Sequence, residues 1–126
     1  MWGESREQYD QVYNGDGLQE NKPELSHELL AGGASFMAMK MFEDRQRKEG
    51  KPVSHQFAKE LLASFAGAEV DRLAETKGAD FIDRERAKRD AEKRTRELYD
   101  DHYGSADNYD PSQSQPNQYI QDSRDY

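Results

Sequence analysis

Residues 28–36 read ELLAGGASF, and residues 60–68 repeat the pattern as ELLASFAGA. In both stretches small residues are set among large apolar ones, as in helices that pack closely against a neighbouring element. A Ser-His pair precedes each copy, Ser26-His27 in one case and Ser54-His55 in the other. The two copies therefore predict two helices that pack against each other, and they bring no catalytic motif.

The first predicted helix covers residues 26–49. Ser26 is a favoured N-cap, Pro23 opposes an earlier start, and Gly50 is a typical residue after a helix end. Its apolar residues recur at the spacing of one helix face, at Leu30, Ala34, Met37 and Met41. Because residues 43–49 are wholly polar, we expect the last two turns to be solvated.

The second predicted helix begins at the N-cap Ser54 and ends at Gly78. A wide apolar stripe runs along it, at Ala58, Leu61, Leu62, Phe65, Ala66, Ala68, Val70 and Leu73. Only Lys51-Pro52-Val53 separates the two helices. Since so short a connection joins neighbours, we expect an antiparallel hairpin.

The glycines of this hairpin need an explanation, because a glycine inside a helix costs about 1 kcal/mol relative to alanine. With the turn near residues 51–52, facing residues have numbers that sum to roughly 103. The expected neighbours are Phe36 with Gly67, Leu30 with Leu73, and Gly32-Gly33 with Val70 and Asp71. Close backbone approach between the two helices is the predicted reason; the alternative is that Gly32-Gly33 breaks the first helix. A phosphate-binding loop is not favoured, because the wider glycine pattern and a preceding strand are missing.

A third predicted helix covers about residues 80–103 and is densely charged. Ala87, Ala91 and Leu98 form a thin apolar stripe on it. We expect this helix to lie on the hairpin through Phe81, Ile82 and Leu98.

The two ends of the chain differ from the middle in charge and composition. Six acids and two bases lie in residues 1–25, and four acids and one base lie in residues 104–126, whereas residues 26–103 are nearly balanced. Low hydrophobicity with net charge is typical of disorder. The predicted fold is therefore all-α, an antiparallel helical hairpin with a third charged helix in a domain at 26–103, flanked by disordered acidic ends.

Both ends carry aromatic residues that qualify this picture. The N-terminal segment contains a set that we expect to form at most one short amphipathic turn docking on the hairpin, Trp2, Tyr9, Val12 and Tyr13. The tail is of low complexity with isolated tyrosines, at Tyr109, Tyr119 and Tyr126.

Composition excludes several classes of protein. There is no cysteine, so disulfides and thiolate chemistry are excluded. No apolar run resembles a signal peptide, and none approaches the roughly 18 residues of a membrane span. We therefore expect a cytoplasmic protein without integral membrane association.

Candidate catalytic and metal-binding residues are few. His27 and His55 fall at opposite ends of the hairpin, while His55 and His102 could share an end with Asp100 and Asp101. Nothing in the spacing enforces metal geometry, so we interpret all three histidines as surface residues and expect no metal site. Among the carboxylates only Glu69 falls near the apolar face, and Arg72 is its expected partner. Ser26 and Ser54 read as helix caps, because no base is placed to activate them.

The third helix carries a basic cluster, Arg84, Arg86, Lys88, Arg89, Lys93, Arg94 and Arg96. Five acids lie between residues 83 and 97 as well, and the chain has a net charge of -8. A surface that tracks phosphates needs a net positive face. We therefore interpret this segment as a solvated helix and expect no nucleic-acid partner.

Several blocks in order resemble the fungal concanamycin-induced protein C family. The blocks are SHELLAGGASF at 26–36, GKPVSH at 50–55, KELLASFAGAEVDR at 59–72 and ETKG at 75–78, with YDQVY at 9–13 and FIDRE at 81–85. The resemblance covers roughly residues 9–103 and leaves out the tail. It implies a small helical protein whose expression accompanies stress or antibiotic response, and it implies no catalytic residues and no cofactor.

Two functions remain as hypotheses. The first is a non-enzymatic, stress-responsive helical protein that binds another protein or itself. The second is a carrier of a small apolar ligand or lipid, held by apolar side chains at Phe36, Met37, Met41, Phe57, Phe65 and Leu73. An enzyme is not expected, because the chain shows no clustered site.

Overall fold

A computed structural model describes residues 1–13, 27–76, 83–113 and 115–122 of the chain. It confirms the all-α prediction: the described residues form helices that pack against one another, with no strand beyond a single β-bridge. The helices are α1 (Trp2–Tyr13), α3 (His27–Glu49), α4 (His55–Thr76), α5 (Arg84–Tyr103) and α6 (Gln118–Asp122). None of these helices is long and apolar enough to cross a membrane.

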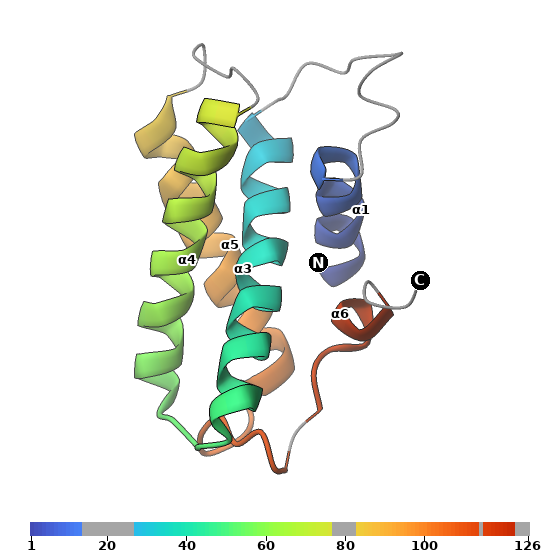
Figure 1. Ribbon diagram of the computed structural model, residues 1–126, viewed down its shortest axis with the longest axis vertical. Coiled ribbons are helices and arrows are strands. Elements are labelled where there is room, and N and C mark those ends of the chain that lie inside the picture. The colour runs from blue at the N-terminus through green and yellow to red at the C-terminus, as the bar shows by residue number, and fades with distance from the viewer. Residues whose placement is uncertain (14–26, 77–82, 114, 123–126) are drawn as a thin grey trace.

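The predicted hairpin is confirmed as α3 and α4, which run antiparallel side by side (Figure 1). Gly50 ends α3 with a φ of 73°, a left-handed conformation that suits glycine, and its N–H donates to the Gln46 carbonyl at 2.8 Å. Ser54 caps α4, since its Oγ accepts from the Phe57 N–H at 3.1 Å. The predicted caps at Ser26 and Gly78 lie outside the described residues.

The third predicted helix is α5, which packs across both α3 and α4 (Figure 1). Asp83 caps its first turn by accepting from the Arg86 N–H at 3.2 Å. The expected stripe is confirmed, because Ala87, Ala91 and Leu98 are all fully buried. The other two expected contacts, Phe81 and Ile82, lie outside the described residues.

Residues 2–13 differ from the predicted disordered segment, because they form the three-turn helix α1 on α3. Trp2, Tyr9 and Val12 are buried on its inner face. The expected apolar residues therefore dock, but on a helix longer than the single turn predicted. The Trp2 and Tyr9 rings lie 6.1 and 5.0 Å from the Phe36 ring. The average composition of residues 1–25 does not reveal this helix, because the many polar residues outweigh the few apolar ones that share its inner face.

The glycines lie close to different elements from those predicted. Helix α3 continues through Gly32 and Gly33, so the helix-break alternative is wrong. A Cβ at Gly33 would lie 3.0 Å from Val12, and one at Gly32 would overlap Gln8. Close approach is therefore the reason for these glycines, but the close neighbour is α1, not α4. Gly67 faces Glu92 and Lys88 of α5 and does not face Phe36.

The tail also differs from the predicted disordered segment. We call residues 104–113 and 115–122 the C-terminal strap; it crosses one end of the bundle and reaches α1 (Figure 1). Tyr109 pairs with Val53 through two backbone hydrogen bonds of 2.9 and 3.0 Å. Tyr109 and Ile120 are fully buried. These two large buried side chains favour docking of the strap, although they do not raise its average hydrophobicity.

Candidate functional site

The three histidines lie apart and each contacts a different part of the fold. His27 Nδ1 lies 3.2 Å from an Asp90 oxygen. His55 lies 2.6 Å from both the Tyr99 hydroxyl and the Ala106 carbonyl, and His102 lies 2.8 Å from the Gln115 carbonyl. In the described part of the chain no three histidine or acidic residues form a group that could hold a metal ion. The histidines therefore tie segments together, with His55 and His102 both holding the strap.

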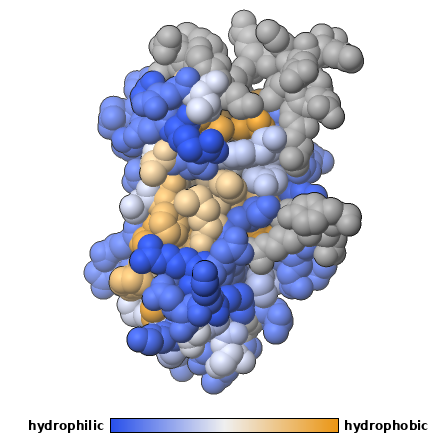
Figure 2. Space-filling view, in the orientation of Figure 1, coloured by the Kyte–Doolittle hydropathy of each residue, from blue (hydrophilic) through white to orange (hydrophobic). Residues whose placement is uncertain are grey.

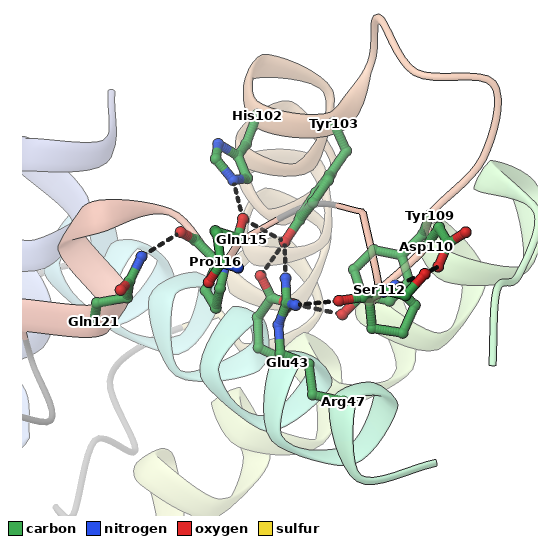
Figure 3. Close-up of polar contacts among 11 residues, drawn as sticks. Glu43, Arg47, His102, Tyr103, Tyr109, Asp110, Ser112, Gln115, Pro116 and Gln121 are labelled. Atoms are coloured by element: carbon green, nitrogen blue, oxygen red, sulfur yellow. Dashed lines mark hydrogen bonds and ion pairs between the residues drawn. The ribbon is translucent and has the colours of Figure 1, made fainter. Parts of the chain in front are cut away.

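The burial of Glu43 is the feature of this region that the sequence analysis did not predict. Glu43 was expected in a solvated turn, but its side chain is fully buried beneath the strap (Figure 3). Its carboxylate accepts hydrogen bonds from the hydroxyls of Tyr103 and Tyr109, the latter at 2.8 Å. Arg47 Nε lies 3.4 Å from the same carboxylate. We call these four residues the Glu43 cluster.

A sequence signal for Glu43 was present. The buried face of α3 contains Phe36, Met39, Glu43 and Gln46, which follow spacings of three, four and three. The helical period therefore continues past the last apolar residue. The end of α3 was expected to be solvated because its residues are polar. A carboxylate can nevertheless be buried when hydrogen-bond and charge partners surround it.

The strap depends on this cluster for its position. Arg47 donates to the Pro111 carbonyl at 3.0 Å and to the Tyr103 hydroxyl at 3.1 Å. Burial and the nearby Glu43 charge raise the pKa of Tyr103 and of Tyr109 well above the usual range. Both phenols therefore stay protonated and continue to donate. The arrangement anchors the strap to α3 and α5.

Glu69 forms a second cluster with Tyr13 and Arg72, which we call the Glu69 cluster. Its side chain is buried on α4, and Arg72 is its partner as expected. The Tyr13 hydroxyl donates to it at 3.0 Å, and Arg72 Nε donates at 2.6 Å. Burial, followed by the Glu69 charge, raises the pKa of Tyr13. This cluster ties the end of α1 to α4.

A continuous apolar area remains on the outside of the hairpin. It lies over α3 and α4 and is bordered by hydrophilic surface (Figure 2). Phe57 is 50% exposed and Met41 37% exposed, and three partly buried neighbours complete it. We call the whole set the apolar surface: Met37 and Met41 on α3, and Phe57, Leu61 and Phe65 on α4.

The helical period explains why these five side chains share one face. Met37 and Met41 are four residues apart, and Phe57, Leu61 and Phe65 follow at the same spacing on α4. Met37, Leu61 and Phe65 rest on the core, so the surface is backed by packed side chains. An exposed cluster of aromatic and methionine residues is typical of a protein-binding surface.

The other side of α4 is polar. A shallow pocket of about 410 Å³ lies between α4 and α5, lined by His55, Gln56, Lys59, Glu60, Ala63 and Arg96. Lys59 is paired with Asp100 at 2.6 Å. Of the basic cluster, Arg84 and Lys88 pair with Asp71, and Arg94 donates to Gln8. Three of the seven basic residues therefore serve contacts between helices.

Comparison with known proteins identifies the family. No curated protein and no solved structure matches the chain. Residues 8–102 match the family model described as virulence factor CipC-like, a span that begins within α1 and ends one residue before the end of α5. That span includes Glu43, Glu69 and the whole apolar surface and leaves out the strap. The chain therefore belongs to the virulence factor CipC-like family.

Proposed function

We propose that the protein is non-enzymatic and acts by binding protein through the apolar surface. The observation that carries this proposal is the exposure of Phe57 and Met41 on one face with three further apolar side chains. A group of exposed apolar side chains bordered by hydrophilic surface often marks a protein-binding site. The family description supports a role connected with virulence or stress, and a cytoplasmic setting stays a prediction.

The polar clusters support this proposal from inside the fold. Glu43 and Glu69 are each held by an arginine and at least one phenol. Acid–base catalysis needs a carboxylate that can reach a substrate, and these two are enclosed by their partners. Their contacts instead connect α1 and the strap to the three longer helices, which gives the apolar surface a rigid support.

Protein binding is tested by replacing the two most exposed apolar residues. The double variant Met41→Ser/Phe57→Ser removes the two most exposed side chains of the apolar surface without touching the buried core. Proximity labelling in stressed cells should recover specific proteins with the parent chain and lose them with this variant. Tyr119→Ser is the matched control, because Tyr119 is 42% exposed at a different site, on α6. Equal labelling by the parent and the double variant would rule out the apolar surface as the binding site.

The carrier hypothesis is not favoured by the geometry. Its six residues do not surround one space, because Phe36 and Leu73 are buried in the core while Met41 and Phe57 face outwards. The shallow pocket beside α4 is lined by none of these six residues. A bound ligand would raise the melting temperature by mass action, so a thermal-shift panel of lipids and apolar compounds separates the two functions.

A further inference from the structure

We propose that the outer face of α5 binds an acidic helix of a partner protein. Four exposed bases form this surface, and we call them the basic row: Arg86, Arg89, Lys93 and Arg96. They lie on the side of α5 opposite the buried Ala87 and Ala91. Helix α5 lies behind α3 and α4 in Figure 1, so the basic row and the apolar surface are on different faces of the molecule. The inference therefore does not depend on the proposed function.

The basic row differs from the other bases of α5 in having no partner within the described part of the chain. Arg84 and Lys88 pair with Asp71, and Arg94 donates to Gln8. No ion pair or side-chain hydrogen bond between described residues involves a member of the row. The row spans ten residues of helix, or about 15 Å. It is therefore a narrow strip of positive charge that the fold itself does not neutralise.

Acids on both sides of the basic row lean towards neighbouring helices. Asp90 Oδ2 lies 3.2 Å from His27 Nδ1 on α3, and Glu92 Oε2 lies 3.3 Å from the position of a Cβ at Gly67 on α4. These acids border the row without pairing with it. A partner with one row of carboxylates fits between the borders, whereas a broad polyanion such as a nucleic-acid duplex would also meet the acids and be repelled.

The spacing of the basic row favours a helical partner. Successive bases are three, four and three residues apart, so they rise by about 4.5, 6 and 4.5 Å along the axis. Glutamates with the same spacing on a partner helix lie on one face and repeat these rises. An extended segment presents side chains on one face about every 6.6 Å and falls out of step with the row. Three of the four bases are arginines, which suit carboxylates.

The pocket between α4 and α5 adds room for an apolar side chain of the partner. Arg96 belongs to the basic row and also lines this pocket, together with Ala63 and Lys59. The stems of lysine and arginine are apolar, so they can cover a leucine side chain. Exposed ion pairs alone contribute little affinity, whereas burial of an apolar side chain contributes more. The expected partner is therefore an acidic helix with an apolar residue at one end of its row of carboxylates.

An NMR titration of the ¹⁵N-labelled full chain tests the proposal. The probe is a synthetic alanine-rich helix with four glutamates spaced three, four and three residues apart and a leucine beside each end of that row. At low ionic strength we expect saturable shifts along α5 and at Ala63, with a Kd of about 1 mM or below, and their loss at about 0.5 M salt. A peptide of the same composition with its glutamates spread around the helix should bind at least about threefold more weakly. Absence of shifts on α5, or equal binding of the two peptides, would overturn the proposal.

Variants of the full chain test the row and the pocket separately, and their spectra show whether each remains folded. Arg89→Gln/Lys93→Gln should weaken binding of the probe by about three- to tenfold. Lys48→Gln/Lys51→Gln is the matched control, because it removes the same charge from exposed residues outside α5. Ala63→Leu fills the pocket and should weaken binding by about threefold with every charge kept. Equal weakening by the two double variants would show that net charge alone matters and would overturn the site.

The same titration separates an acidic helix from a phosphate surface. A DNA duplex of about 12 base pairs and vesicles that contain phosphatidylserine replace the peptide in parallel titrations. We expect both to bind the parent chain more weakly than the peptide, because its net charge is -8 and acids border the row. Tighter binding of either one, lost in Arg89→Gln/Lys93→Gln, would assign the basic row to phosphates and overturn the acidic helix.

Discussion

The Glu43 cluster and the Glu69 cluster each anchor one end of the chain to the helical bundle, but their carboxylates differ in enclosure. Each places a buried carboxylate where a phenol from an end of the chain can reach it, Tyr109 from the strap and Tyr13 from α1. Glu43 is fully enclosed and holds two phenols, whereas Glu69 holds one, and its arginine is about half exposed. We therefore expect the strap to be the more firmly anchored end, because the Glu43 charge that holds it is farther from water than the Glu69 charge.

Removal of the strap should have the largest effect. A chain that ends at Tyr103 loses the buried side chains of Tyr109 and Ile120, each worth about 1.5–3 kcal/mol, so we expect unfolding free energy to fall by roughly 3–6 kcal/mol. Urea unfolding followed by circular dichroism measures this. A chain that ends at Asp122 is the control, since it keeps every described contact. Equal stability of the two truncations would mean that the strap is not part of the fold.

Alanine at each carboxylate compares the clusters directly. Glu43→Ala removes the shared acceptor of two buried phenols and the charge that pairs with Arg47, so we expect a loss of about 3–5 kcal/mol. Glu69→Ala should cost about 1–2 kcal/mol, because Arg72 can turn to water. Chemical denaturation of both variants tests the order. If Glu69→Ala lowers the free energy of unfolding as much as Glu43→Ala or more, the Glu43 cluster is not the stronger anchor.

Alkaline pH should weaken both clusters, and the Glu43 cluster more. The folded state raises the pKa of Tyr13, Tyr103 and Tyr109 above the ordinary 10.0. Their contribution is complete below pH 10 and is lost above it, because the unfolded chain then releases protons that the folded chain keeps. Each such tyrosine adds about 1.4 kcal/mol of loss per pH unit. Stability measured at pH 9 to 11 should fall less steeply for Tyr109→Phe; an unchanged slope would contradict this assignment.

Alanine at two glycines should give the smallest effects, with opposite signs. Gly33→Ala places a methyl group 3.0 Å from Val12 and 3.4 Å from the Gln8 carbonyl, so we expect about 1 kcal/mol of destabilisation as α1 is pushed away. Gly67→Ala meets only the flexible ends of Glu92 at 3.3 Å and Lys88 at 3.6 Å, so it should stabilise α4 by up to about 1 kcal/mol. Thermal melts of the two variants test the signs. If Gly67→Ala destabilises the protein instead, Gly67 must be in tight contact with α5.

The hairpin was predictable because its signals are local. Ser54 and Gly50 mark helix ends through their own backbone preferences, and the stripe that includes Leu62 and Val70 follows from helical spacing. The candidate site was only partly predictable. Met41 and Phe57 were identified as apolar residues of the hairpin, but their exposure depends on which sides of α3 and α4 the other helices cover.

The neighbours of the glycines were not predictable for the same reason. Gly32 and Gly33 signal that some element comes close, yet nothing in the chain says that the element is α1. A hairpin register assigns facing residues within α3 and α4 only, whereas three helices compete for the surface of α3. Gly67 was accordingly assigned to Phe36 when it faces α5.

The sequence by itself determined the helices, their ends and the antiparallel pairing of α3 with α4, because capping, periodicity and a short connection act over a few residues. The tertiary structure decided which polar residues are buried and which apolar residues are left outside. Glu43 is buried because Tyr103 and Tyr109 approach it from 60 and 66 residues away, and Phe57 is exposed because no described segment covers it. Burial is a property of the assembled elements, so it follows from their packing and not from residue type.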